Sequence, residues 1–448
     1  MADVSAKKRI WGWFFFDFAS QPYNTLLLTF IFGPYIAGVI GDGTKAQSAW
    51  GFGIAAAGIV IAILAPILGA IADNSGNRVR WIWLFSAMYF IGAFGLWWSA
   101  PDNFNLYFVL FSFAVGLIGM EFATIFTNSM LPDLGTKEEI GKLSGNGWAF
   151  GYVGGLIALV IMLLLFDDGA GGKTLIGRDP LFGLDASARE GTRFVGPFSA
   201  IWYAVFMIPF FLWVRDPRTT AMSRLKVSAA LSDLGKTLKN LPSTPSLFAY
   251  LASSMFYRDA LNGIYVFGGI YAAGVLGWTS TNIGIFGIIA IITGAIFAWI
   301  GGRSDHRFGP KPVITVCIVV LTMVSILIVF ISRESVLGIA VGPDSALPDQ
   351  IFYVLGAIIG AAGGAVQSAS RTMMVRQANP DRMTEAFGLY ALAGKATSFV
   401  APLAIGIATV ATGSQRLGIT PLIGLFLIGL FLLIWVKPNG EHGEHSAS

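Results

Sequence analysis

The amino-acid sequence predicts an all-α polytopic membrane protein with twelve transmembrane helices in two six-helix repeats. Two observations carry this prediction: the composition is too apolar for a soluble core, and a six-helix pattern occurs twice along the chain. Hydrophobic residues make up 55% of the 448 residues and charged residues only 12%, whereas soluble domains carry about 25% charged residues. A soluble fold of this length has no core large enough to hide so much apolar surface.

Twelve segments are long and apolar enough to cross a bilayer, which takes about 20 apolar residues in a helix. In chain order they are 11–40, 48–72, 81–100, 105–130, 145–166, 197–214, 246–276, 280–301, 312–331, 350–371, 385–411 and 418–436. The basic, amphipathic stretch 215–245 separates the sixth segment from the seventh. We therefore expect a first half at 1–214, a cytoplasmic linker at 215–245, a second half at 246–436 and a disordered tail at 437–448.

The distribution of basic residues predicts the orientation. Segments expected on the cytoplasmic side hold 20 of the 29 Lys and Arg residues, segments expected outside hold 7, and Arg258 and Lys395 lie inside helices. This asymmetry follows the positive-inside rule and places both termini in the cytoplasm, which we take to be bacterial, with the chain in the inner membrane. The formal charge of +4 thus reflects topology, and we expect no nucleic-acid partner.

The second six helices repeat features of the first. The stretch SMLPDLGTKEEIGKLSG at 129–145 aligns without a gap with TMMVRQANPDRMTEAFG at 372–388, at a constant offset of 243. The loop GAIADNSGNRVR at 69–80 matches the loop GGRSDHRFGPK at 301–311. A third match joins the first and seventh helices: Phe14, Asp17 and Tyr23 against Phe256, Asp259 and Tyr265. Two six-helix repeats of equal orientation are typical of secondary transporters.

The two matched loops have the composition of a clasp between helices. Each carries Gly, then Asp four residues on, then Gly and a basic residue, and the second loop has one extra residue between Asp and Gly. The glycines allow a tight turn and close helix approach, and Asp73 can bind a neighbouring helix N-terminus or pair with Arg78 or Arg80. An ordinary polar turn is the alternative. The candidate gating residues are Gly69, Asp73, Gly76, Arg78, Gly301, Asp305, Gly309 and Lys311.

Polar side chains inside the apolar segments are candidate functional residues, because an ionisable group in a bilayer is costly unless it is paired or hydrated. Helical spacing puts them on shared faces of the first, fourth and seventh helices, with Asp259 about 100° round its helix from Arg258 and within reach of Asn262. The offset of 243 carries the stripe of the fourth helix to the tenth. The candidate substrate-binding or coupling residues are Asp17, Gln21, Asn24, Glu121, Asn128, Arg258, Asp259, Asn262, Gln367, Arg371 and Lys395.

The charges among these residues are close to balanced. The acids are Asp17, Glu121 and Asp259, and the bases are Arg258, Arg371 and Lys395. Such a set suits a zwitterionic solute, which needs a base for its carboxylate and an acid for its ammonium group; a purely structural ion network is the alternative. Glu121 has no base near it in the sequence, so we favour it over Asp259 as the group that exchanges a proton.

The matched loops resemble the signature loop of the major facilitator superfamily, over all twelve helices. Four stretches give a finer match: FDFASQPY in the first helix, TNSMLPDL after the fourth, SGNGWAFGYVGG at 144–155 and FGLYALAGKATSFVAPL at 387–403. Together they resemble the vacuole-effluxer-like branch, whose fungal members export amino acids from the vacuole and whose bacterial members mostly have no assigned substrate. The resemblance implies that helices 1, 4, 7 and 10 line a central cavity.

The sequence therefore predicts a monomeric secondary transporter that moves a small polar solute, such as an amino acid, by alternating access, with proton coupling as an option. Two alternatives remain open. One is a membrane sensor or scaffold on a transporter fold without flux, with 215–245 as its partner-binding segment; the other is an exporter of other organic ions. The sequence contains no metal-ligand cluster and no nucleophile triad, so we expect neither a cofactor nor an enzyme.

Overall fold

The computed structural model describes residues 4–41, 43–75, 77–168, 171–216, 227–278, 280–342 and 344–441. Within these residues, twelve helical spans are long and apolar enough to cross a membrane, which confirms the all-α class and the predicted number of spans. The chain divides into two compact units. Unit 1 contains Met1–Leu134 and Phe150–Lys226, and unit 2 contains Gly135–Ala149 and Val227–Ser448.

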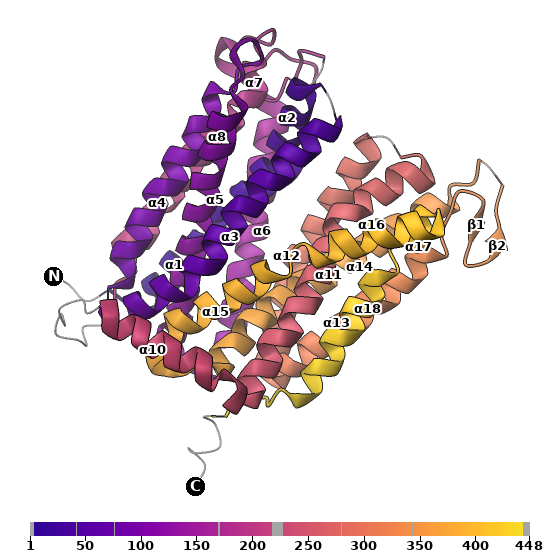
Figure 1. The fold of residues 1–448 in the computed structure, drawn as a ribbon. Helices are drawn as coiled ribbons and strands as arrows, with labels where there is room; N and C mark the ends of the chain where they lie inside the picture. Colours follow the sequence, from indigo (N-terminus) through magenta and orange to yellow (C-terminus); the bar gives the residue numbers. More distant parts are fainter. Residues whose placement is uncertain are drawn as a thin grey trace. The chain divides into compact units, whose positions relative to one another are not determined.

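The first six spans follow one another in the order shown by the colours of Figure 1. The first span consists of α1 (Ala6–Pro22), the π-helical segment η1 (Tyr23–Phe30) and α2 (Phe32–Ile40). The next four spans are α3 (Gly43–Ser75), α4 (Arg78–Gly95), α5 (Leu106–Ser129) and α6 (Ile140–Leu165). The sixth consists of α7 (Glu190–Arg193), α8 (Val195–Phe206) and α9 (Ile208–Trp213).

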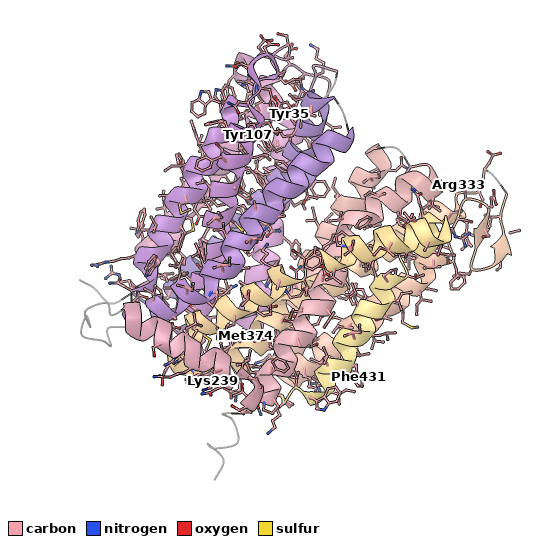
Figure 2. The ribbon with its side chains drawn as sticks, viewed as in Figure 1. Tyr35, Tyr107, Lys239, Arg333, Met374 and Phe431 are labelled. Atoms are coloured by element: carbon pink, nitrogen blue, oxygen red, sulfur yellow. The ribbon has the colours of Figure 1, made fainter. Side chains whose placement is uncertain are left out.

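Besides the start of α6, unit 2 contains α10 (Val227–Asn240), which lies in the predicted linker, and the last six spans. The seventh to tenth spans are α11 (Pro245–Leu276), α12 (Ser280–Phe308), α13 (Pro310–Val329) and α14 (Leu347–Gln377). The last two spans consist of α15 (Met383–Ala396), α16 (Val400–Thr412), α17 (Gln415–Gly418) and α18 (Pro421–Leu432). The short antiparallel strands β1 (Ser335–Val336) and β2 (Ile339–Ala340) form a hairpin between α13 and α14, near the labelled Arg333 in Figure 2.

Prolines explain where two of the spans are interrupted. Proline has no backbone N–H and its ring clashes with the carbonyl four residues before it. Pro22 ends α1, and the π-helical segment follows directly, at the position where the sequence predicts a bend. Pro402 lies in the first turn of α16, and the residue four positions before it, Ser398, lies in the non-helical turn that separates α15 from α16.

Large apolar side chains remain exposed on the outer surfaces of both units. Tyr107 on α5 is 85% exposed and Phe431 on α18 is 59% exposed (Figure 2). Exposed apolar side chains on helices of this length are what a hydrocarbon environment requires. The chain is thus an integral, multi-pass membrane protein.

Glycines on α6 allow α1 to pack directly against it. A Cβ added to Gly151 would lie 3.3 Å from the Cβ of Asp17, and one added to Gly155 would lie 2.8 Å from the Cγ of Gln21. The sequence predicts a small-residue face on this helix from the four-residue spacing of its glycines, and the structure confirms it at these two positions. Small residues at helix contacts let backbones approach closely.

The first residues of the predicted disordered tail are held in place. The backbone N–H of Lys437 donates to Ser246 Oγ at 2.8 Å, and Gln377 Nε2 donates to the Lys437 carbonyl at 2.6 Å. Glu441 accepts a hydrogen bond from the N–H of Ser246 at the start of α11. The prediction of disorder is therefore wrong for 437–441, because these residues satisfy polar groups at two helix ends; residues 442–448 lie outside the described part of the chain.

Candidate functional site

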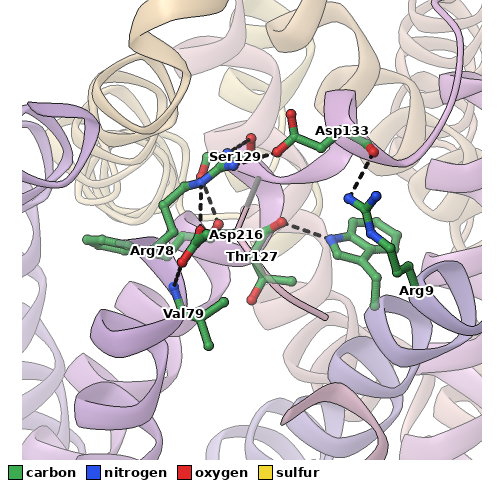
Figure 3. A network of polar contacts seen from close by, with 9 residues as sticks. Arg9, Arg78, Val79, Thr127, Ser129, Asp133 and Asp216 are labelled. Carbon is green, nitrogen blue, oxygen red and sulfur yellow. Dashed lines mark hydrogen bonds and ion pairs between the residues drawn. The ribbon is translucent and has the colours of Figure 1, made fainter. Parts of the chain in front are cut away.

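Arg78, in the loop after the second span, connects three segments of unit 1 (Figure 3). Its Nη1 donates to the carbonyl of Ser129 at 2.9 Å, at the C-terminal end of α5, and its Nη2 lies 2.5 Å from Asp133 Oδ2. Its Nε lies 3.5 Å from Asp216 Oδ1, just after α9, and Asp216 also accepts the Val79 N–H. The guanidinium thus ties together the ends of three helices.

The predicted pair of Asp73 with Arg78 or Arg80 stays a prediction, and the acids that hold Arg78 beside the end of α5 are Asp133 and Asp216. The guanidinium is favoured there because the unsatisfied carbonyls at the C-terminal end of α5 attract a cation. Asp73 lies half-buried in the last turn of α3, Gly69 is buried one turn earlier, and Gly76 falls outside the described residues.

Replacing Arg78 by alanine is expected to destabilise the protein by about 2 kcal/mol at neutral pH, because hydrogen bonds from a charged group contribute about 1.5–3 kcal/mol. Burial raises the pKa of the Asp216 carboxyl above its ordinary value of 3.8, and the Val79 N–H and Arg78 oppose this rise. An acid whose folded pKa is raised binds more protons when folded, so stability falls as pH increases through that window. Without Arg78 the pKa of Asp216 rises further, so the protein loses more stability as the pH increases.

The measurement is the Tm of the Arg78→Ala variant and of the wild type at an acidic pH and at neutral pH. The deficit of the variant should be larger at the higher pH. Arg80→Ala is the matched control, because Arg80 is exposed two residues further along the same helix. A deficit that is equal at both pH values would contradict the role of Asp216.

The loop after the eighth span places Asp305 against the first turn of α6, within unit 2. A Cβ added to Gly141 would lie 2.8 Å from the Cγ of Asp305, which is fully buried. Arg376 Nη2 lies 4.0 Å from Asp305 Oδ1. A carboxylate at a helix N-terminus is the arrangement that the loop pattern predicts.

The other residues of this loop set its turn and anchor its ends. Gly309 has a φ of +83°, a conformation that favours glycine. Lys311 Nζ donates to the carbonyls of Ile434 and Val436 at the end of the last span. A Cβ added to Gly301 would lie 3.0 Å from the Cα of Ala365, so this glycine allows α12 to approach α14.

The polar stripes on α1 and α5 form the half-buried faces of those helices. Asp17, Gln21 and Asn24 are half-buried in the first span. On α5 the half-buried positions are Glu121, Thr124 and Asn128, and the residues between them are buried. The predicted stripes are therefore faces that the apolar core of unit 1 does not cover.

Asp17 and Glu121 lie at a similar level of two antiparallel helices. Two hydrogen bonds fix this alignment: Trp13 Nε1 donates to the Thr127 carbonyl at 2.8 Å, and the Tyr23 hydroxyl donates to the Phe113 carbonyl at 2.6 Å. Asp17 and Glu121 fall at matching positions between these two contacts.

On α11, the structure separates Arg258 from Asp259. Arg258, Asn262 and Tyr265 form a half-buried to exposed stripe, as predicted, whereas Asp259 is 3% exposed on another side. The predicted reach of Asp259 to Asn262 stays a prediction, and Asp259 Oδ2 accepts the N–H of Ala401 at 2.9 Å. That N–H belongs to the first turn of α16, where backbone donors have no partner inside the helix.

Arg258 turns to α15. Its Nη1 donates to the carbonyl of Tyr390 at 3.0 Å, and its guanidinium carbon lies 4.0 Å from the centre of the Tyr390 ring. A Cβ added to Gly394 would lie 2.7 Å from both Arg258 Nη atoms, so the glycine leaves room for the guanidinium. Lys395, the next residue on α15, is half-buried.

Arg371 is buried within unit 2, and its predicted role in substrate binding or coupling stays a prediction. It is 4% exposed, its Nε donates to Ser144 Oγ at 3.0 Å, and its Nη2 donates to the Ser144 carbonyl at 2.8 Å. Its guanidinium also lies 5.5 Å from the Trp148 ring. Gln367, one turn earlier on α14, is half-buried, and its Nε2 donates to the Gly363 carbonyl.

Several residues that complete these sites are absent from the candidates read from the sequence. They are Ser144, Asp133, Asp216, Tyr390 and Gly394. Four of them, all except Asp216, lie within the stretches 127–134, 144–155 and 387–403 that carry the family resemblance. The family motifs thus contain four of these residues, whereas helical spacing did not point to any of them. Within the described residues, no group of three or more His, Cys, Asp or Glu side chains is placed to hold a metal ion.

Comparison with known proteins gives a consistent result. The family model described as "Vacuole effluxer Atg22 like" matches residues 37–446. The chain is 25% identical over 429 residues to the "Uncharacterized MFS-type transporter YxiO" of Bacillus subtilis (strain 168), which covers 95% of this chain and 94% of that protein.

Fungal relatives match over a shorter part. The chain is 23% identical over 300 residues to "Autophagy-related protein 22" of Cryptococcus neoformans var. neoformans serotype D (strain JEC21), covering 65% of this chain and 49% of the relative. The match thus spans about half the length of that protein. Among solved structures, the proton:xylose symporter XylE of the major facilitator superfamily aligns with a TM-score of 0.69 at 13% identity, over 98% of each chain. At 13% sequence identity, this structural similarity establishes only that the chain has the major facilitator fold.

Proposed function

Because the chain belongs to the vacuole effluxer Atg22-like family and has the major facilitator fold, we propose that it is a secondary transporter for small zwitterionic solutes of the amino-acid class, driven by alternating access. Membrane transport follows from the family and the fold. The class of solute, the coupling ion and the residues that carry them are the proposal.

The single observation that supports this proposal most strongly is that each unit has a polar face on helices that are otherwise apolar. The face of unit 1 contains the carboxylates of Asp17 and Glu121, and the separate face of unit 2 contains Arg258 and Asn262. Polar groups inside a membrane are functional by default, because their burial in lipid is unfavourable. We assign both faces to the solute pathway.

The charges of the two faces favour a zwitterion over a simple ion. An amino acid presents a carboxylate and an ammonium group, which an arginine and a carboxylate recognise through charge-assisted hydrogen bonds. Arg258 is the proposed partner of a solute carboxylate in unit 2, and Asp17 or Glu121 is the proposed partner of an ammonium group in unit 1. The family description, "Vacuole effluxer Atg22 like", is compatible with a small metabolite as the solute.

We propose protons as the coupling ion, with Glu121 as the group that exchanges them. Its position level with Asp17 supports this assignment, since two neighbouring carboxylates share protons more readily than an isolated one. The proposed orientation has both termini in the cytoplasm of a bacterial inner membrane, on the strength of the positive-inside distribution. The proposed working form is a monomer.

A non-transporting sensor is the second candidate function, supported by α10. This helix carries Leu234 buried on one side and the exposed Leu238, Lys236 and Lys239 on others. If α10 binds a partner, scrambling the sequence of 227–240 should abolish the signal that the sensor passes to its partner, while solute binding persists. Export of other organic ions remains the alternative for the cargo.

The proposal is tested by the thermal stability of the purified protein in a panel of amino acids and small organic ions. A solute at about 100 times its Kd stabilises the folded state by about 2.7 kcal/mol. We expect at least one amino acid to raise the Tm of the wild type and to have no such effect on Arg258→Ala. The exposed Arg307 gives the matched control Arg307→Ala, which should respond like the wild type. A wild-type response that survives in Arg258→Ala would remove Arg258 from the binding site.

A further inference from the structure

The eleventh span is broken, and two adjacent residues of α11 contact the two sides of the break. The helix stops at Ala396 and resumes at Val400. Arg258 contacts α15 before the break, at Tyr390, and Asp259 contacts α16 after it, at Ala401. The equivalent fifth span, α6, runs from Ile140 to Leu165 as a single helix, so the break is a feature of the second repeat alone.

The two oxygens of Asp259 have different surroundings. Oδ2 accepts the Ala401 N–H at 2.9 Å. Oδ1 is buried and has no hydrogen-bond partner among the described residues, although the side chain is only 3% exposed. A helix N-terminus stabilises one oxygen of a carboxylate, but a second oxygen that is buried without a partner is unfavourable in a low-dielectric interior.

Among the described residues of the neighbouring helices, no positive charge is found to contact this oxygen. Arg258 turns to Tyr390 on α15, and Arg371 of α14 donates to Ser144. Arg416 of α17 donates to the Val329 carbonyl. Helices α16 and α18 carry no charged residue at all, and α15 contributes Lys395, which is half-buried beyond Gly394.

Uncharged oxygens lie close to the break. Thr397, in the turn between α15 and α16, has its hydroxyl 3.5 Å from the carbonyl of Met255, which is one helical turn before Asp259 on α11. Hydroxyl, carbonyl and carboxylate oxygens are the groups with which proteins hold a small hard cation or a proton, and here all three kinds occur within one helical turn of the break.

We propose that Asp259 binds a monovalent cation, a proton or Na⁺, through Oδ1, and that this site at the break of the eleventh span is a second coupling site of the transporter, in addition to Glu121. The coupling role of this site rests on the proposed function, whereas the binding of an ion is inferred from the contacts of Asp259 alone. A proton would come from water, form the O–H bond at Oδ1 and leave the carboxyl neutral. Either ion lowers the negative charge that Asp259 offers to the N-terminus of α16, so occupancy weakens the contact that fixes the second half of the span.

The experiment measures ion-dependent stability without any solute. The Tm of the purified protein is followed at constant ionic strength while Na⁺ replaces K⁺, and separately in K⁺ from about pH 5 to about pH 8, the range in which a buried carboxyl titrates. The variants are Asp259→Asn and Asp259→Glu. Asp344→Asn is the matched control, because it makes the same chemical change at an exposed loop position of unit 2.

A Na⁺ site predicts a saturable rise of the Tm with Na⁺ in the wild type and in Asp344→Asn, and no rise in Asp259→Asn. A proton site predicts no Na⁺ effect but a pH dependence of the Tm that Asp259→Asn loses. Ion responses that are the same in the wild type and Asp259→Asn overturn the proposal.

If Asp259→Asn does not fold, the test uses Asp259→Glu. Its carboxyl is displaced by one methylene, so the Na⁺ concentration or the pH at which the Tm changes half-way must shift. An unchanged midpoint of the Tm response also overturns the proposal. Absence of any bound solute would affect the proposed function and leave this result intact.

Discussion

Replacing Arg371 by alanine is expected to destabilise the protein by about 3 kcal/mol or more and to abolish transport. Arg371 is 4% exposed and donates through both Nε and Nη2 to Ser144 at the start of α6. Hydrogen bonds from a charged donor contribute about 1.5–3 kcal/mol each, and removing one partner leaves the buried acceptors unsatisfied. The loss removes the contact of α14 with α6 within unit 2.

The measurement is the Tm in detergent together with solute flux in liposomes, and Arg371→Lys is the matched variant. Lysine keeps the charge, but its compact ammonium group cannot reproduce the two-nitrogen contact of the planar guanidinium, so it should restore only part of the stability. An Arg371→Ala protein with wild-type Tm would show that Ser144 is not a stabilising partner.

Replacing Gly302 by alanine is expected to have the second large effect, at a contact where two helices touch backbone to backbone. A Cβ on Gly302 would lie 2.6 Å from the carbonyl oxygen of Gly141 and 2.7 Å from the Cα of Gly145. Both neighbours are backbone atoms of α6, so no side chain can move aside. Overpacking of this kind costs about 1–3 kcal/mol, which corresponds to a lower Tm.

Gly284→Ala is the matched control, because Gly284 lies on the same helix, α12, with no atom within 4 Å of the added Cβ. There the methyl group meets open space, and alanine is favoured over glycine in a helix by about 1 kcal/mol, so the two variants should change the Tm in opposite directions. Equal changes would mean that the close approach of α6 and α12 does not limit stability.

Helical periodicity located the polar faces correctly. Glu121, Thr124 and Asn128 are spaced for one face of α5, and they are the half-buried positions in a helix whose intervening residues are buried. The number of spans followed in the same way from the length and hydropathy of each segment. Both properties are local, so a single sequence contains them.

Partners of the charged residues could not be found from spacing, because they lie far away in the sequence. Asp259 contacts Ala401, and Arg371 contacts Ser144, which is 227 residues away. Helical geometry places Asp259 beside Arg258 but does not say which neighbouring helix covers it. The break of the eleventh span exposes the N–H groups that Asp259 binds, and Pro402 was its only local sign.

The family motifs supplied part of what spacing could not. In the stretch SGNGWAFGYVGG, Ser144 binds Arg371 and Gly151 packs against Asp17. In TNSMLPDL, Ser129 and Asp133 bind Arg78. These motif residues make contacts between helices, so their pattern is a signature of packing within each unit rather than of the solute.

The central claim is that the protein moves a small polar solute across a membrane, and uptake into proteoliposomes tests it most directly. Purified protein is reconstituted, loaded with unlabelled solute and presented with the same labelled solute, across a panel of amino acids and small organic ions, with protein-free liposomes as the blank. We predict saturable counterflow of at least one zwitterionic solute and its loss in Arg258→Ala. Folded wild-type protein that gives no saturable flux of any solute in the panel would contradict the account.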